Sequence, residues 1–118
     1  MSEIIFHGVW CYDVDFENFV PELPHNFYRS INVEVGHKSL ATKSTFSVTV
    51  CSFTWLAHHY SNEGPQWGRH LLLVGQYNAE EIRKAITERV LQCSRPTWEK
   101  SLEMLCRYFI WEFEDYVP

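Results

Sequence analysis

The chain has 118 residues, of which 46% are hydrophobic and 16% aromatic, and it carries a formal net charge of −5 at pH 7. This apolar content excludes a disordered chain, and the length suits one domain over residues 1–118 that buries its own core. The acidic balance disfavours a nucleic-acid backbone as ligand and favours a cationic partner.

The first half of the chain predicts strands. Residues 3–12 alternate imperfectly between apolar and polar side chains, which indicates a strand with a bulge near Gly8. Residues 13–26 carry prolines and acids and predict an irregular, exposed connection. Residues 27–35 and 46–51 alternate cleanly on either side of a polar turn, so we expect an antiparallel hairpin.

The second half predicts helices after one further strand. Residues 53–60 predict a short helix, and the consecutive leucines within 69–75 predict a central strand buried on both faces. A capping box at Asn78 opens a helix that runs to about residue 93, and a second helix is expected over 97–113. The predicted fold is α+β, with an antiparallel sheet of about four strands and two C-terminal helices packed on one face.

The four cysteines, Cys11, Cys51, Cys93 and Cys106, are irregularly spaced, and each lies in an apolar segment. The first residues lack the basic and long apolar regions of a secretory signal, so we expect a cytoplasmic protein with free, buried thiols. The longest apolar run, residues 71–75, is far shorter than a membrane span, so no membrane partner is expected.

Candidate catalytic and metal-binding groups are sparse. His58 and His59 are adjacent and diverge on a helix, and no zinc-type spacing accompanies them, so we expect neither metal nor cofactor. Arg107 is a single cation followed by acids, which argues against direct recognition of nucleic acid. The enzyme alternative that stays open is a small hydrolase using Glu112 or Asp115 with His70.

Acidic residues gather towards both ends of the chain. Residues 1–28 contain no Lys or Arg, and neither do residues 108–118. In the second of these segments aromatic rings alternate with carboxylates, a composition that suits an interface for a basic protein. The predicted partner-binding residues are Asp13, Asp15, Glu17, Glu22, Trp111, Glu112, Glu114, Asp115 and Tyr116.

Three segments carry a resemblance to a known family. They are Val50-Cys51 with Trp55-Leu56, then Trp67-Gly68-Arg69-His70 leading into residues 71–74, and finally the run from Arg107 to Tyr116. Together they resemble the immunity protein 8 family of bacterial polymorphic-toxin and contact-dependent growth inhibition systems. The family-typical positions in this chain are Trp67, Gly68, Arg69, Trp111, Glu112, Asp115 and Tyr116.

The resemblance implies a non-enzymatic α+β protein that binds and neutralises a cognate toxin domain, often a basic nuclease. Family-typical residues can maintain the fold instead of touching the toxin, in which case the contacts would come from the acids between Asp13 and Glu22. An adaptor that keeps its partner active is a further alternative.

Overall fold

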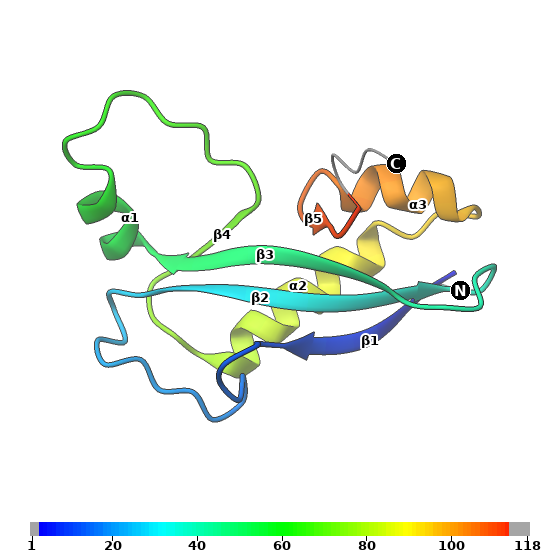
Figure 1. Ribbon diagram of the computed structural model, residues 1–118, viewed down its shortest axis with the longest axis horizontal. Helices are drawn as coiled ribbons and strands as arrows, with labels where there is room; N and C mark the ends of the chain where they lie inside the picture. Colours follow the sequence, from blue (N-terminus) through cyan, green and yellow to red (C-terminus); the bar gives the residue numbers. More distant parts are fainter. Residues whose placement is uncertain (1–2, 114–118) are drawn as a thin grey trace.

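The computed structural model describes residues 3–113 as a sheet with one long helix, α2, packed across it. Figure 1 shows α2 behind β2 and β3, with α1 at one end of the sheet and α3 towards the other. In chain order the elements are β1 (Ile4–Trp10), β2 (Tyr28–His37), β3 (Ser44–Ser52), α1 (Phe53–His59), β4 (Leu71–Val74), α2 (Ala79–Gln92), α3 (Trp98–Leu105) and β5 (Ile110–Trp111).

The sheet is mixed, with the order β1-β2-β3-β4 and with β5 paired to β3. The β1–β2 and β2–β3 pairs are antiparallel, whereas β4 runs parallel to β3 along residues 49–52. The two residues of β5 pair antiparallel with Phe46 and Ser47. One edge of β3 pairs with β2. The other edge pairs with β5 at residues 46 and 47 and with β4 at residues 49–52.

The predicted bulge and hairpin are confirmed. The register of β1 against β2 shifts between Phe6 and Gly8, and Gly8 has a φ of 144°, a conformation that residues with a Cβ rarely adopt. The pairing of β2 with β3 continues from Tyr28 opposite Cys51 to Val35 opposite Ser44.

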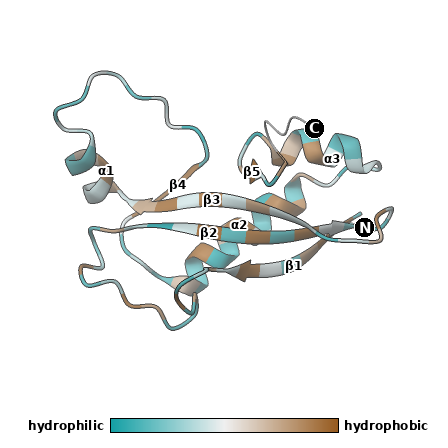
Figure 2. Cartoon of the chain, in the orientation of Figure 1, coloured by the Kyte–Doolittle hydropathy of each residue, from teal (hydrophilic) through white to brown (hydrophobic). Residues whose placement is uncertain are grey.

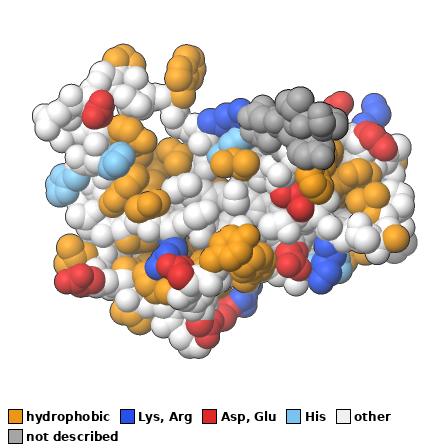
Figure 3. All heavy atoms as spheres, viewed as in Figure 1, with side chains coloured by type: hydrophobic (Ala, Val, Ile, Leu, Met, Phe, Trp, Pro, Cys, Tyr) orange, Lys and Arg blue, Asp and Glu red, His pale blue; other side chains and the backbone are white. Residues whose placement is uncertain are grey.

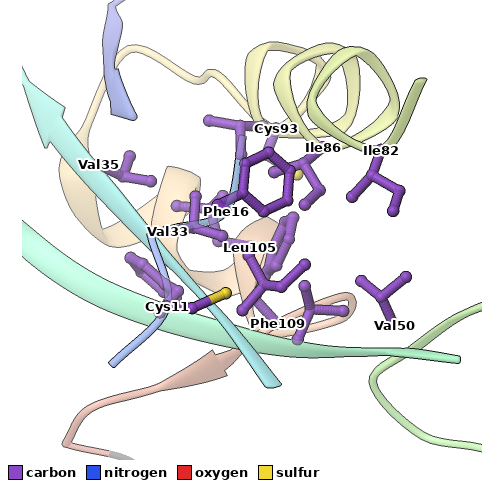
Figure 4. Packing of buried hydrophobic residues seen from close by; sticks show 14 of the residues in the cluster. Cys11, Phe16, Val33, Val35, Val50, Ile82, Ile86, Cys93, Leu105 and Phe109 are labelled. Carbon is purple, nitrogen blue, oxygen red and sulfur yellow. The ribbon is translucent and has the colours of Figure 1, made fainter. Parts of the chain in front are cut away.

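The core lies between one face of the sheet and α2. Alternation directs Ile31, Val33 and Val35 of β2 to the side that α2 covers, and each of them has an exposed fraction of 0%. Ile82 and Ile86 project from α2 into the same core, as Figure 4 shows. Figure 2 shows both hydrophobic and hydrophilic residues along α2. One side of the helix packs on the sheet and the other side faces solvent.

α2 begins at the predicted cap Asn78, and α3 begins after Thr97, near the predicted start of the second helix. The side-chain oxygen of Asn78 accepts a hydrogen bond from the Glu81 backbone N–H at 3.0 Å. The Thr97 hydroxyl accepts one from the Lys100 backbone N–H at 3.3 Å. These bonds satisfy amide groups that have no partner within the helix.

The prediction that residues 69–75 form a central strand is wrong. β4 is shorter, lies at the edge of the sheet, and leaves Leu73 38% exposed. Leu72 and Val74 pack against the core, while Leu73 points away from it. The apolar residues 71–74 therefore form a strand with one buried face.

The prediction of a helix to about residue 113 is also wrong, because α3 ends at Leu105. The backbone N–H groups of Tyr108 and Phe109 both donate to the Leu105 carbonyl, and this turn brings Ile110 and Trp111 alongside β3. Aromatic and β-branched side chains favour such an extended, half-buried position.

The α+β fold with its helices packed on one face is confirmed, with a mixed sheet in place of a purely antiparallel one. Cys11, Cys51 and Cys93 are buried free thiols and Cys106 is half-buried. Burial raises the pKa of the three buried thiols. No helix within residues 3–113 has both the length and the apolarity to cross a membrane.

Replacing Ile86 by Ala is expected to lower the free energy of unfolding by about 2–5 kcal/mol, because the side chain fills the space between α2 and the sheet. Leu91 lies on the same helix but is 42% exposed, so Leu91→Ala should cost less than about 1 kcal/mol. Urea denaturation of both variants measures the difference, and equal losses would contradict this account of the core.

Candidate functional site

The face of the sheet opposite α2 is open and carries a groove beside β5. The groove has a volume of about 320 Å³ and lies between the end of β1 and β5. In Figure 3, which views this open face, hydrophobic side chains gather near the centre, and acidic and basic side chains are interspersed around them. The residues that line the groove are Tyr12, Asn32, Thr45, Phe46, Ser47, Ile110, Trp111 and Glu112.

Tyr12 is the most prominent ring of the groove, and sequence reasoning missed it. Its side chain is 84% exposed, yet its ring makes an edge contact with Trp10 at a centroid distance of 4.6 Å. Ile110, across the groove, is 41% exposed. Exposed apolar side chains that line one groove are typical of a contact surface.

Glu112 is fixed at the groove by two backbone contacts to Thr45. Its N–H donates to the Thr45 carbonyl at 3.0 Å, and its carboxylate accepts from the Thr45 N–H. The carboxylate is therefore held at a defined place on the edge of β3, although the residue remains exposed. A carboxylate held in this way loses little conformational freedom when a partner binds.

Trp111 differs from the prediction of a surface ring on a helix. It lies opposite Phe46 in the sheet, so its ring points to the same side as that buried phenylalanine. The ring is half-buried, packs against the core, and meets Phe113 edge-on at 5.2 Å. Among the predicted partner-binding residues, Glu114, Asp115 and Tyr116 lie outside the residues that the structure describes.

The acids of the N-terminal connection do not share one environment. Asp13 forms an ion pair with Arg29, with 3.0 Å between the carboxylate oxygen and the guanidinium nitrogen. Glu17 forms an ion pair with Arg83. Asp15 accepts hydrogen bonds from the Glu17 N–H at 3.0 Å and from the Asn18 side chain at 2.6 Å. Within residues 3–113, Asp15, Glu22 and Glu112 have no cationic partner.

Tyr77 anchors this acidic connection to the rest of the molecule. Its hydroxyl donates to the Phe16 carbonyl at 2.8 Å, and its backbone N–H donates to the Pro24 carbonyl at 3.0 Å. Its ring also makes edge contacts with Phe16, Phe19 and Phe27. The connection is irregular in backbone but is attached along its length, which gives its acids defined positions.

A second cavity of about 420 Å³ lies between α2, β4 and the turn after α3. We call it the arginine cleft, because Arg69, Arg89 and Arg107 line it, with Glu88 as the one acid among the described lining residues. The guanidinium of Arg89 lies 4.2 Å above the ring of Tyr108, a cation–π contact. Sequence reasoning missed this cleft, since its arginines are far apart along the chain.

His70 forms part of the wall of the arginine cleft. It is 8% exposed with a φ of 60°, and its carbonyl accepts from the Thr49 N–H at 3.1 Å. Its ring Nε2 lies 3.0 Å from the Cys106 carbonyl and 3.1 Å from Arg69 Nε. One nitrogen either donates or accepts, so only one of these contacts is a hydrogen bond in a given tautomer.

An aromatic ladder lies at the α1 end of the molecule. Tyr28 stacks on Trp55 at 4.7 Å, and Trp55 stacks on His59 at 4.5 Å. Helix α1 has no buried residue, and Trp67 in the following loop is 99% exposed. No cluster of three or more potential metal ligands occurs within residues 3–113.

Comparison with known proteins bears on this arrangement. A family model described as immunity protein 8 matches residues 5–116, nearly the whole chain. The chain belongs to the immunity protein 8 family. The searches of curated proteins and of solved structures returned no match.

The segments that resemble the immunity protein 8 family meet in the fold. Residues 68–72 and 107–109 are far apart in sequence, yet both line the arginine cleft. The same C-terminal run continues through Ile110 and Glu112 into the groove of the open face. Family-like residues therefore border both cavities.

The stability of the protein is expected to depend on pH through Tyr77, which is partly buried and lies near charged groups. Burial is the main cause that raises the pKa of the phenol from 10 to about 12, and the nearby Asp15 carboxylate adds to the rise. The unfolded chain ionises first, so this contribution is complete below about pH 10 and is lost as the pH rises towards 12.

Unfolding midpoints between about pH 9 and pH 12 measure this effect. Tyr77→Phe should unfold more easily at neutral pH, by about 1 kcal/mol, and should lose part of the alkaline decline. The exposed Tyr28→Phe serves as control and should keep that decline. A decline of the same size in Tyr77→Phe as in the unsubstituted chain would contradict the assignment.

Proposed function

We propose that this protein is an immunity protein that binds a cognate toxin domain one-to-one and keeps that domain inactive. The observation that carries the proposal is the family match over residues 5–116. Because it spans nearly the whole chain, the family's defining role applies to the domain as a unit and not to a fragment of it. The toxin-producing bacterium would make this protein in its cytoplasm.

The positions of Glu112 and His70 favour binding over catalysis by this pair, and Asp115 lies outside the described residues. Glu112 lies at the open-face groove, whereas His70 lies in the wall of the arginine cleft. The two groups therefore face different cavities, which argues against their acting as an acid–base pair on one substrate. The Glu112 carboxylate is also engaged by the Thr45 N–H, a role in holding β5 against β3.

The contact surface that we propose is the groove of the open face together with the acids beside it. Tyr12 offers a large, supported ring, and Glu112 offers a fixed carboxylate across the groove. Rings that are held before binding make effective anchors, because little side-chain entropy remains to be lost. Asp13 follows Tyr12 directly in the chain, so the acids of the connection between Asp13 and Glu22 begin beside the groove.

The proposed partner surface is basic, as expected of a nuclease-type toxin domain. Asp15, Glu22 and Glu112 have no cationic partner within residues 3–113, so they are available to a cationic surface. Asp13 and Glu17 already pair with Arg29 and Arg83, which makes their contribution smaller. We include Trp111, Glu114, Asp115 and Tyr116 in the proposed contact set through their continuity with Glu112.

Removal of the Tyr12 ring is the sharpest test of the surface. Tyr12→Ala should weaken binding of the toxin domain encoded beside this chain by about 2 kcal/mol, roughly thirtyfold, as for a central aromatic anchor. The matched control is Tyr28→Ala, which removes another exposed tyrosine at the far aromatic ladder. Calorimetric titration gives both affinities; equal effects would place the interface elsewhere.

Charge steering makes a separate prediction. Raising ionic strength from about 0.05 M to 0.5 M should slow association several-fold, and Glu22→Lys should slow it at low salt. Glu103→Lys, on the exposed side of α3, is the charge-matched control and should have a smaller effect. Stopped-flow association rates that are independent of salt would contradict an acidic recognition face.

The inhibitory role needs its own measurement, because an adaptor would also bind. Cells that express the toxin domain should grow only when this protein is co-expressed, and Tyr12→Ala should reduce that protection. A stable complex in which the toxin keeps its activity would instead support the adaptor alternative.

A further inference from the structure

The arginine cleft concentrates positive charge within an acidic protein. Among the described residues, its lining includes three arginines and one glutamate, in a chain of net charge −5. Arg89 and Arg107 form no ion pair with any carboxylate of residues 3–113. A concave site lined by one sign of charge raises the local concentration of the opposite ion.

Most of the remaining lining residues are apolar, and His70, Gln92 and Tyr108 add polar groups. Leu71 and Leu72 come from β4, Ile86 from α2, and Phe109 from the turn after α3. Both Ile86 and Phe109 belong to the buried core, so this part of the wall is rigid. The cleft therefore combines an apolar floor with guanidinium groups at its border.

The two arginines approach the cleft from separate elements. Arg89 projects from α2 and is oriented by its contact with the Tyr108 ring at 4.2 Å. Arg107 precedes that ring in the turn after α3. Planar guanidinium groups match the oxygen geometry of phosphate and carboxylate and also stack on rings.

We propose that the arginine cleft is a binding site for a small organic anion that carries a phosphate or carboxylate on a planar ring. The cavity volume of about 420 Å³ falls in the range of small-molecule sites. Arg89 and Arg107 bind the anionic group, and the apolar floor takes the ring. This site lies apart from the open-face groove and does not depend on toxin binding.

Phenyl phosphate, benzoate, inorganic phosphate and benzyl alcohol are the probes. With the full chain at about 20 mM salt, calorimetry and amide chemical shifts should show phenyl phosphate binding more tightly than inorganic phosphate, and benzyl alcohol not binding. Benzoate tighter than phenyl phosphate would assign the anionic group as a carboxylate, and the reverse order would assign it as a phosphate. Shifts confined to residues outside the cleft would overturn the proposal.

Variants test the charge requirement. Arg107→Gln should weaken phenyl phosphate binding roughly tenfold, as expected for loss of a charge-assisted contact. Glu88→Gln should tighten it, because the variant removes the one acid among the described lining residues. Lys84→Gln removes a cation from the same helix outside the cleft and should change nothing.

Circular dichroism and unfolding midpoints establish that each variant is folded. Equal weakening by Lys84→Gln and Arg107→Gln would mean that net charge alone drives binding, which contradicts a defined site. If an acidic peptide with aromatic residues binds the cleft more tightly than phenyl phosphate does, the natural ligand is a protein segment and the small-molecule assignment is wrong.

Discussion

The packing of α2 across one face of the sheet is the constraint on which the rest of the molecule depends. Ile82, Ile86 and Val90 fill the space above Val33 and Val50, and these side chains have almost no exposed surface. Their removal from water is the dominant favourable contribution to such a fold. Because α2 and α3 pack on the same face, the opposite face stays open, and the proposed binding groove lies there.

Phe109 links this core to both cavities. Its ring is 3% exposed and meets Phe46 edge-on at 6.5 Å, which holds the chain after α3 against the sheet. Residues on one side of Phe109, Arg107 and Tyr108, line the arginine cleft, and residues on the other side, Ile110 to Glu112, line the open-face groove. One buried ring thus positions two surfaces of opposite chemical character.

The sequence predicted those elements whose signals are local. The hairpin, the bulge at Gly8 and the cap at Asn78 follow from alternation, glycine conformation and side-chain hydrogen bonding between near neighbours. The length of α3 and the place of β4 were mispredicted, because both are decided by pairing with β3. Helical periodicity in residues 98–113 could not show that Phe46 and Ser47 offer a free edge.

The candidate sites were predictable only in part for a related reason. The acidic character of the N-terminal connection was visible in the sequence, but the ion pairs of Asp13 with Arg29 and of Glu17 with Arg83 join distant segments. Tyr12 carried a usable signal, since it lies two residues after Trp10 and continues the alternation of β1. The arginine cleft carried none, because Arg89 and Arg107 come together through the packing of α2 and the turn after α3.

The hydroxyl of Ser94 links the start of β1 to a turn that is synthesised much later. The backbone N–H groups of Glu3 and Ile4 both donate to the Ser94 hydroxyl oxygen, at 2.9 Å and 3.1 Å. β1 is synthesised before the other described elements, yet these bonds can form only once the turn between α2 and α3 has been made. Contacts this distant along the chain slow folding, so the start of β1 is held in place only after α2 has been synthesised.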